Sequence, residues 1–387
     1  MQDKPRSVLY ATSARIGGVG LDAVAYQTLC GIKDRLGKAI AYGIRARDLD
    51  RRKVTTLAWH PVRLLSNLDR KYYYGAKKTA LDRVASRVMQ QESFDLFHGW
   101  SGEALRSLRV ARELGIPSVL EIPTWHRHKG NIVPPKTESE IAMEKAPLPQ
   151  RWLNRLLISR QQSLEEYELA DLLLVLSEKA EETFEFAGFP KTKLFRLSRG
   201  VDVERFRPGK KPDDFRALFV GALIKRKGVH VLLEAWKALN LARAELWLAG
   251  YPHPEIEPYL QDLPSSVKIL GFNERVEELY QQSSVFVFPS ECEGSAKATY
   301  EAASCGLAQI TTRESGDVVV NGLNGIIIPP NNPDALCEAL LTLYKNREIA
   351  ERMGAGGRIR VIEHFTWDHF RRRILEAYRV AVAIRQP

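Results

Sequence analysis

Short apolar runs alternate with amphipathic stretches along the whole chain. In the first half these runs cover residues 8–12, 39–44, 94–98, 118–122, 172–176 and 194–197. In the second half they cover residues 217–220, 244–249, 267–270, 285–288, 308–311 and 325–328. Their length and their aliphatic, β-branched and aromatic content are typical of buried strands. Between two of them, residues 231–239 place apolar side chains at helical spacing.

The alternation of apolar strands with helices indicates the fold class. Strands that are apolar throughout are typical of parallel sheets covered by helices on both faces. The segment Pro208-Gly-Lys-Lys-Pro212 separates the two sets of strands. We therefore predict an α/β protein with two Rossmann-like domains. Residues 127–150, which are rich in Pro and charge, are expected to form a long loop.

The composition excludes several classes of protein. The chain has 387 residues, of which 44% are hydrophobic and 27% charged, values typical of globular proteins rather than disordered ones. Its four cysteines are scattered without metal-ligand spacing, which favours reduced thiols. No secretory signal is readable near the first residue, and no apolar run approaches the roughly 20 residues of a spanning helix. We expect a cytoplasmic protein.

Positive charge is concentrated in the first 90 residues. The whole chain carries a net +10, whereas residues 1–90 contain 18 Lys and Arg against 7 Asp and Glu, a net +11. Within residues 45–87 these bases alternate with Trp59, with leucines and with Tyr72-Tyr73-Tyr74. This pattern suits peripheral contact with an anionic membrane on its inner face, or with a lipid-linked acceptor. The alternative is a solvated helical face with its own buried side, and we predict no nucleic-acid partner.

A small-residue turn follows the strand at residues 285–288. Pro289 ends that strand, and a helix is predicted from Lys297 to Cys305. The turn between them contains Glu293, Gly294, Ser295 and Ala296. Small residues let a ligand approach the backbone, and free N–H groups at a helix start attract anions. With Glu301 two helical turns later, the segment can hold a diphosphate between two hydroxylated groups.

The spacing from Glu293 to Glu301, followed by Ala-Ala-x-Cys-Gly, resembles the signature of family-4 retaining glycosyltransferases. Four further segments resemble that family in the same order. They are residues 167–171 with Ser177, residues 200–202 before Phe206, residues 220–228, and residues 321–330. The resemblance extends from about residue 167 to residue 370 and is thin before residue 95.

This resemblance implies a GT-B fold and a division of labour between its domains. An acceptor-binding domain would comprise residues 1–205 together with a returning C-terminal helix at 367–387. A nucleotide-sugar-binding domain would comprise residues 213–366. Glu293 would face the donor sugar and the transition state, and Glu301 would bind the ribose hydroxyls. Arg226 and Lys227 would bind the diphosphate, at a loop where Ala222 replaces the Arg usual in the family.

A second glycine loop, Ile16-Gly-Gly-Val-Gly20, follows the first predicted strand. It resembles the family's loop that meets acceptor and diphosphate, which gives Gly17, Gly18 and Gly20 a donor-binding role. It also loosely matches the dinucleotide pattern of a nicotinamide-dependent enzyme. Arg45 and Arg47 stand where such an enzyme needs an acidic ribose ligand, so we favour the glycosyltransferase.

The predicted site therefore has two groups of residues. The catalytic group is Lys227, Glu293, Arg226 and His126, where the resemblance has His126 touch the donor sugar and plain loop packing is the alternative. The donor-binding group is Gly17, Gly18, Gly20, Gly221, Gly294, Ser295, Ala296, Lys297 and Glu301. No metal is required, and Asp48-Leu-Asp50 is interpreted as a solvated turn.

The predicted function is retaining, metal-independent transfer of a sugar from a nucleotide-sugar donor, a UDP- or GDP-sugar first, to a hydroxyl acceptor. A lipid-linked or cell-surface glycan precursor is one class of acceptor, and the nucleotide sugar is a co-substrate, so no cofactor is needed. Two alternatives stay open. One is a sugar-nucleotide epimerase or phosphorylase on the same fold. The other is a non-catalytic GT-B partner subunit, which the absence of the usual Arg at Ala222 suggests.

Overall fold

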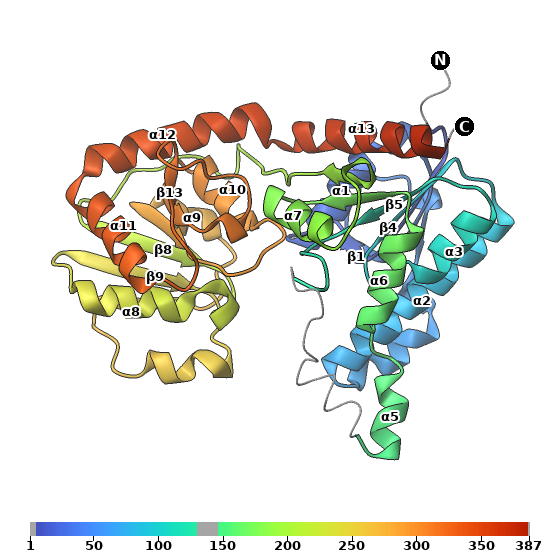
Figure 1. The fold of residues 1–387 in the computed structure, drawn as a ribbon, viewed down its shortest axis with the longest axis horizontal. Coiled ribbons are helices and arrows are strands. Elements are labelled where there is room, and N and C mark those ends of the chain that lie inside the picture. Colours follow the sequence, from blue (N-terminus) through green and yellow to red (C-terminus); the bar gives the residue numbers. More distant parts are fainter. Residues whose placement is uncertain (1–4, 130–145, 386–387) are drawn as a thin grey trace. The chain divides into compact units, whose positions relative to one another are not determined.

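The computed structural model describes residues 5–129 and 146–385, and the chain folds into two compact units (Figure 1). The first unit comprises Met1–Val175, Glu181–Leu197 and Phe370–Pro387, and the second comprises Leu176–Ala180 and Ser198–His369. The sequence predicts domain boundaries at residues 205 and 213, with a return at residue 367. In the structure the first unit ends at Leu197, and the chain returns to it at Phe370.

The first unit contains a parallel sheet with the strand order β3-β2-β1-β4-β5-β6-β7. Its strands are β1 (Val8–Ile16), β2 (Leu36–Ile44), β3 (Val54–Thr56), β4 (Leu96–Trp100), β5 (Ser118–Glu121), β6 (Leu172–Val175) and β7 (Leu194–Arg196). The α-helices around it are α1 (Leu21–Gly31), α2 (Arg70–Gln91), α3 (Leu105–Glu113), α5 (Leu148–Asn154) and α6 (Arg160–Leu169). Short 3-10 helices are η1 (Lys33–Arg35), η2 (Arg51–Lys53), η3 (Leu57–Trp59), η4 (Pro61–Asn67) and η5 (Lys191–Lys193). Two helices have residues in both units, α7 (Glu178–Phe186) and α13 (Trp367–Arg385).

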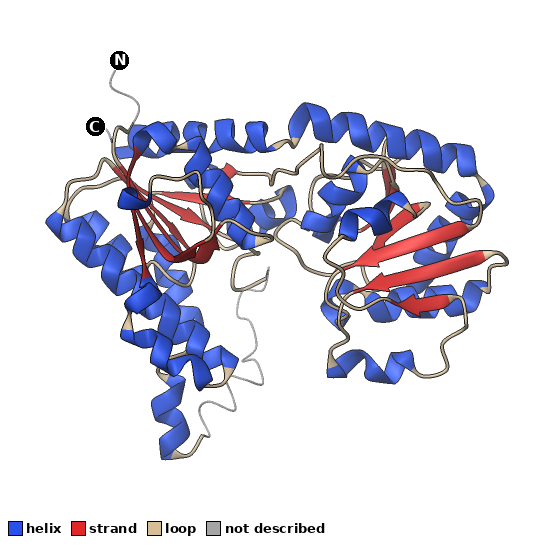
Figure 2. Cartoon of the chain, turned by 180° about the vertical axis from the view of Figure 1, so that it is seen from behind, coloured by secondary structure: helices blue, strands red, loops and turns tan. Residues whose placement is uncertain are grey.

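The second unit contains a parallel sheet with the strand order β10-β9-β8-β11-β12-β13. Its strands are β8 (Phe215–Val220), β9 (Ala244–Ala249), β10 (Val267–Ile269), β11 (Val285–Phe288), β12 (Ala308–Thr311) and β13 (Gly325–Ile327). Its helices are α8 (Val229–Leu239), α9 (Val276–Gln281), α10 (Lys297–Ser304), α11 (Pro333–Lys345) and α12 (Arg347–His364), with the 3-10 helices η6 (Lys225–Lys227), η7 (Pro254–Leu260) and η8 (Arg313–Ser315). Helices lie on both sides of each sheet (Figure 2).

The structure confirms the predicted α/β fold with two Rossmann-like parallel sheets. Each apolar run of the sequence overlaps a strand, and β9, β11 and β12 match their predicted bounds. Strand β3 was missed, because it is a three-residue edge strand with two threonines. The loop predicted at residues 127–150 lies mostly outside the described residues, and its last part is wrong, since α5 begins at Leu148.

Both sheets have a point at which the strand order reverses. In the first sheet this point lies between β1 and β4, and in the second between β8 and β11. In open parallel sheets, ligands bind outside the carboxyl ends of strands at such a point. The loops that follow β1, β8 and β11 are therefore the first places to look for chemistry.

Candidate functional site

In the second unit, a glycine lies at the contact between the loops after β8 and β11. Gly228 has a φ of +71°, and a Cβ at this position would lie 2.1 Å from the carbonyl oxygen of Pro289. Only glycine permits both the left-handed backbone and this approach. The contact holds η6, which carries Arg226 and Lys227, against the turn that follows β11.

Glu293 and two bases form one cluster at this contact. Lys227 Nζ donates to Glu293 Oε1 at 2.9 Å, and an Arg226 guanidinium nitrogen donates to the same oxygen at 3.0 Å. The side chains of Glu293 and Lys227 are only 16% and 17% exposed, whereas that of Arg226 is 42% exposed. Arg226 also donates to the Cys292 carbonyl oxygen. Charge-assisted hydrogen bonds in partly buried surroundings hold these three side chains in one arrangement.

The turn before α10 has a mixed set of backbone groups. The N–H groups of Glu293 and Ala296 donate to the carbonyl oxygens of Glu314 and Ser315 at 3.0 and 2.8 Å. Within the described part of the chain, no acceptor lies within hydrogen-bond distance of the N–H groups of Ser295 and Lys297. The Ala296 N–H is thus already paired within the protein, while the N–H groups of Ser295 and Lys297 remain available to an anion.

Glu301 lies in a second, more buried cluster on α10. Its carboxylate is 7% exposed, pairs with Lys297 at 2.8 Å, and accepts the Tyr280 hydroxyl at 3.0 Å. Burial, followed by the Glu301 charge, raises the pKa of Tyr280 well above its usual range, so that the hydroxyl stays protonated and donates. Tyr280 was missed, because nothing in the sequence distinguishes it from a core tyrosine of α9.

Further contacts fix the small residues of the turn. Gly316 has a φ of +115°, and a Cβ there would lie 2.6 Å from Ser295 Oγ, so Ser295 packs directly on this backbone. The Ser295 hydroxyl also lies 2.7 Å from that of Tyr300. Gly221, after β8, has a φ of +150° and faces the Lys227 stem, since a Cβ there would lie 3.4 Å from Lys227 Cδ. The sequence therefore indicated the turn but not Gly316 and Tyr300, which support it.

The glycine loop after β1 belongs to the first unit. Gly17, Gly18 and Gly20 have φ values of +92°, +133° and +63°, all in the region that favours glycine. Asp22 organises this loop, because its carboxylate accepts the Arg15 N–H at 3.0 Å and its carbonyl accepts the Gly17 N–H at 3.1 Å. The loop has the form the sequence indicated, and its contact with a donor stays a prediction.

His126 lies in an aromatic cluster of the first unit. It is 2% exposed, and its ring lies 5.0 to 5.8 Å from the rings of Phe184, Tyr167 and Phe189. Burial lowers the pKa of His126 to about 4, which keeps the imidazole neutral. This arrangement agrees with the loop packing that the sequence offered as the alternative, and a contact of His126 with the donor sugar stays a prediction.

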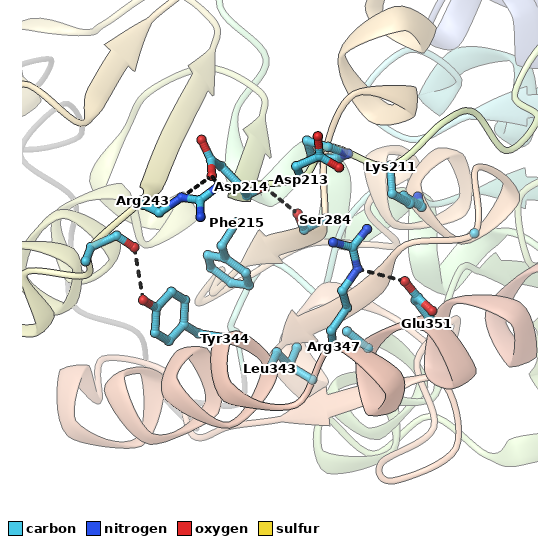
Figure 3. Close-up of a pocket in the computed structure, with 14 residues that line it drawn as sticks. Lys211, Asp213, Asp214, Phe215, Arg243, Ser284, Leu343, Tyr344, Arg347 and Glu351 are labelled. Carbon is cyan, nitrogen blue, oxygen red and sulfur yellow. Dashed lines mark hydrogen bonds and ion pairs between the residues drawn. The ribbon is translucent and has the colours of Figure 1, made fainter.

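A separate pocket of about 270 Å³ lies at the amino ends of β8 and β9, at the opposite edge of the second sheet (Figure 3). Its charged walls pair with one another, Arg243 with Asp214 at 2.8 Å and Arg347 with Glu351 at 2.9 Å. None of the residues predicted for donor binding or catalysis lines it. Among residues 5–129 and 146–385, no group of His, Cys, Asp and Glu side chains is arranged to hold a metal ion.

No helix in the described ranges has the length and apolar character needed to cross a membrane. Comparison with curated proteins finds an uncharacterised glycosyltransferase of Methanocaldococcus jannaschii, 32% identical over 39% of this chain and 44% of the relative. A capsular polysaccharide biosynthesis glycosyltransferase of Staphylococcus aureus is 28% identical over 44% of this chain and 50% of the relative. The chain thus spans about half the length of these two relatives.

Comparison with solved structures covers almost the whole chain. Anabaena HepE, in a complex with UDP-glucose, matches with a TM-score of 0.67 and 15% identity, covering 96% of this chain and 98% of that one. At this identity the likeness shows the fold, which is GT-B. Residues 214–346, which include Glu293 and both of its partners, match the family model for glycosyl transferases group 1. Residues 214–346 of the second unit are therefore similar to the glycosyl transferases group 1 family.

Proposed function

We propose that the protein transfers a sugar from a nucleotide-sugar donor to a hydroxyl acceptor, with retention of configuration and without a metal ion. The observation that carries this proposal is the cluster of Glu293, Lys227 and Arg226 at the reversal point of the second sheet. It lies beside the start of α10, whose backbone donors suit a phosphate. An acid for hydroxyl groups and two bases for a diphosphate are the groups that such a donor needs.

Donor binding would exchange partners within this cluster. Arg226 and Lys227 now neutralise Glu293, and an incoming diphosphate would take over part of their hydrogen bonding. Glu293 would then accept hydrogen bonds from the donor sugar. As the glycosidic bond breaks, negative charge grows on the leaving diphosphate, and cations already fixed in place stabilise it. A phosphate oxygen would take the acceptor proton, so no side chain needs to act as the base.

The identity of the donor is supported by similar proteins. The structure of Anabaena HepE contains UDP-glucose. The Staphylococcus aureus relative is named for capsular polysaccharide biosynthesis. We therefore propose a UDP-sugar as the first donor to test and a GDP-sugar as the second, with a glycan precursor as acceptor.

A thermal-shift screen against UDP-, GDP-, ADP- and dTDP-sugars tests the donor. A ligand at 100 times its dissociation constant stabilises the folded state by roughly 2.7 kcal/mol, which is a visible shift. We expect one nucleotide class to raise Tm in the native chain and in a Lys225→Met control. Lys225 is the exposed neighbour whose side chain faces the Tyr259 ring instead of Glu293. If none of the four classes raises Tm, the proposal fails.

Product analysis tests the reaction itself. With the donor and an acceptor extract, we expect release of a nucleoside diphosphate and a glycoside whose anomeric configuration matches that of the donor by NMR. EDTA should leave the rate unchanged. Conversion of one sugar nucleotide into another would instead indicate an epimerase, and tight donor binding without release would indicate a non-catalytic subunit.

We also propose peripheral contact with an anionic membrane, through an exposed apolar patch of the first unit. The patch consists of Trp59, Leu64, Leu148 and Trp152, which are 98%, 82%, 74% and 71% exposed. The segments that carry these residues both adjoin α2, because η4 contacts this helix and the Tyr72 hydroxyl donates to Asn154 at the end of α5. Exposed Arg52 on η2 and exposed Lys71 on α2 lie before and after η3 and η4 in the chain. Tryptophan beside bases suits the headgroup region of a membrane.

Sedimentation with vesicles tests this contact. We expect the native chain to bind phosphatidylglycerol vesicles at low salt and to release them at high salt, while phosphatidylcholine vesicles bind weakly. The double variant Trp59→Ser, Leu64→Ser should lose this binding. Leu114→Ser, at a 52% exposed leucine of the α3 end, is the matched control. Equal sedimentation of both variants would remove the patch from the proposal.

A further inference from the structure

The first unit contains a cavity of about 660 Å³ at the carboxyl ends of β1, β2 and β4. Helix α2 forms one of its walls. Four cationic and two acidic side chains line it, namely Arg15, Arg70, Lys77, Lys78, Asp22 and Glu103. Because the first sheet reverses its strand order between β1 and β4, the cavity lies where this kind of sheet binds ligands.

One face of α2 supplies most of the charge. Arg70, Tyr73, Tyr74 and Lys77 follow one another at the three- and four-residue spacing that puts side chains on the same side of a helix. All four line the cavity. The Tyr73 hydroxyl lies 2.6 Å from that of Tyr42 on β2, which connects this face to the sheet. The helix thus presents two bases to the cavity and holds them with tyrosines.

Lys77 is the unusual group in this wall. It is only 8% exposed, and its ammonium lies 4.6 and 4.5 Å from the ring centroids of Tyr42 and Tyr74. In the described part of the chain, no carboxylate forms an ion pair with it or with Arg15, Arg70 and Lys78. A cation over an aromatic ring gains less free energy than a buried charge loses by leaving water. Burial accordingly lowers the pKa of Lys77 below its usual value.

The two carboxylates of the cavity accept hydrogen bonds from backbone N–H groups. Glu103 accepts the Ser13 N–H at 2.7 Å, and Asp22 accepts the Arg15 N–H at 3.0 Å. Burial raises the pKa of Glu103, which further weakens it as a counter-ion. The hydrogen bond from Arg70 lowers the pKa of the Tyr74 hydroxyl, as expected in a positive environment. The cavity therefore carries more positive charge than its own walls neutralise.

We propose that this cavity binds a phosphate or carboxylate group of the acceptor, with Lys77 at its base and Arg70 at its mouth. That the bound anion belongs to the acceptor rests on the proposed function, whereas the anion site itself is argued from residues of the first unit alone. A ligand anion would supply the counter-charge that Lys77 lacks. Its source is either a soluble phosphate ester or a lipid headgroup, and both offer the same oxygen acceptors to the same cations.

Binding of two pairs of probes distinguishes these sources. The soluble pair is glucose 6-phosphate against glucose, and the lipid pair is phosphatidic acid vesicles against phosphatidylcholine vesicles, each at low salt. We expect the phosphomonoester of at least one pair, glucose 6-phosphate or phosphatidic acid, to bind, and Lys77→Met to weaken its binding at least tenfold. Arg70→Gln, at an exposed helix start where folding is not at risk, should weaken it several-fold. Lys33→Met removes the same charge from an exposed position outside the cavity and should change nothing.

Each result decides the proposal. Binding of the phosphate ester that depends on Lys77 supports a soluble anionic acceptor, and dependence seen only with vesicles supports a lipid-borne one. If neither phosphomonoester probe binds, or if Lys33→Met weakens binding as much as Lys77→Met, the proposed anion site is wrong. The nucleotide-sugar screen is run on the same variants. If a nucleotide sugar still raises Tm in Lys77→Met and no anion binds, the proposed function is retained and the anion site is rejected. If the anion binds and no nucleotide sugar raises Tm, the anion site is retained and the proposed function is rejected.

Discussion

The sites at the carboxyl ends of the two sheets differ in whether their charged side chains form ion pairs. In the second unit, every predicted acid is paired with a predicted base, Glu293 with Lys227 and Arg226, and Glu301 with Lys297. In the first unit, Lys77 faces two tyrosine rings, and no carboxylate within the described residues forms an ion pair with it. Each base of the second site thus has a carboxylate partner before a ligand arrives, whereas Lys77 of the first site has no ion-pair partner among the described residues.

This difference means that the second site is already ordered for a ligand, whereas the first site lacks a counter-ion that a ligand would supply. A self-paired cluster keeps cations in place without leaving a buried charge uncompensated, so a donor has only to exchange hydrogen-bond partners. A buried ammonium without a counter-ion costs stability that only a bound anion restores. The comparison predicts that substitutions in the second unit mainly reduce rate and affinity, whereas substitution of Lys77 stabilises the unliganded protein.

The largest effect is expected for Lys227→Met. Removing one fixed cation that faces a developing charge typically costs about 10²–10³ in rate. We expect a loss of this size in release of nucleoside diphosphate, measured with saturating donor. Lys225→Met, two residues earlier on η6, should retain a nearly native rate. Equal losses in the two variants would mean that the general charge of this loop, rather than its contact with Glu293, supports the reaction.

Much of this architecture follows from the sequence. Apolar runs such as residues 285–288 indicated their strands, because strands buried on both faces must be apolar throughout. Edge strand β3 (Val54–Thr56) gave no such signal, since it pairs only with β2 and contains two threonines. The turn from Glu293 to Ala296 was found through its small residues, and its place after β11 follows from strand order.

The pairing of side chains was not predictable in the same way. Glu293 and Lys227 are 66 residues apart, and they meet because Gly228 approaches Pro289, a contact that no periodicity encodes. The bases of residues 45–87 pointed to a charged surface, yet α2 buries Lys77. The spacing of Arg70, Tyr74 and Lys77 on one helix face was the available signal, but only the position of β2 shows that this face lines a cavity.

A smaller effect is expected at Glu301. Hydrogen bonds to a charged group contribute about 1.5–3 kcal/mol each, so Glu301→Ala should weaken nucleotide-sugar binding at least tenfold. Tyr280→Phe removes only the hydroxyl that donates to Glu301 and should weaken binding a few-fold. Calorimetry with the donor that the thermal screen identifies measures both. If Tyr280→Phe weakens binding as much as Glu301→Ala, the carboxylate acts by supporting the fold of α10 and does not bind the ribose itself.

Lys211, in the pocket of Figure 3, provides a pH test of a base outside both sites. Burial lowers the pKa of Lys211 to about 8 from its ordinary 10.5. The folded chain therefore binds fewer protons than the unfolded one between these values, and stability rises with pH across that window. Lys211→Met should raise Tm by a few degrees at pH 7, and this gain should shrink as pH approaches 10.5. A gain that does not depend on pH would contradict the assignment to charge.

The smallest effect, and the one that tests the comparison directly, is the thermal stability of the unliganded Lys77→Met variant. Methionine keeps most of the volume and loses the charge, so the desolvation penalty disappears together with the contacts to Tyr42 and Tyr74. Because the two changes oppose each other, we expect Tm to rise by only about 1–3 °C. Lys227→Met should instead lower Tm slightly, since Glu293 keeps only Arg226 as its partner. Differential scanning calorimetry of both variants in phosphate-free buffer measures the two signs. A fall in Tm for Lys77→Met would mean that the tyrosine rings already satisfy this ammonium, and the contrast between the two sites would then disappear.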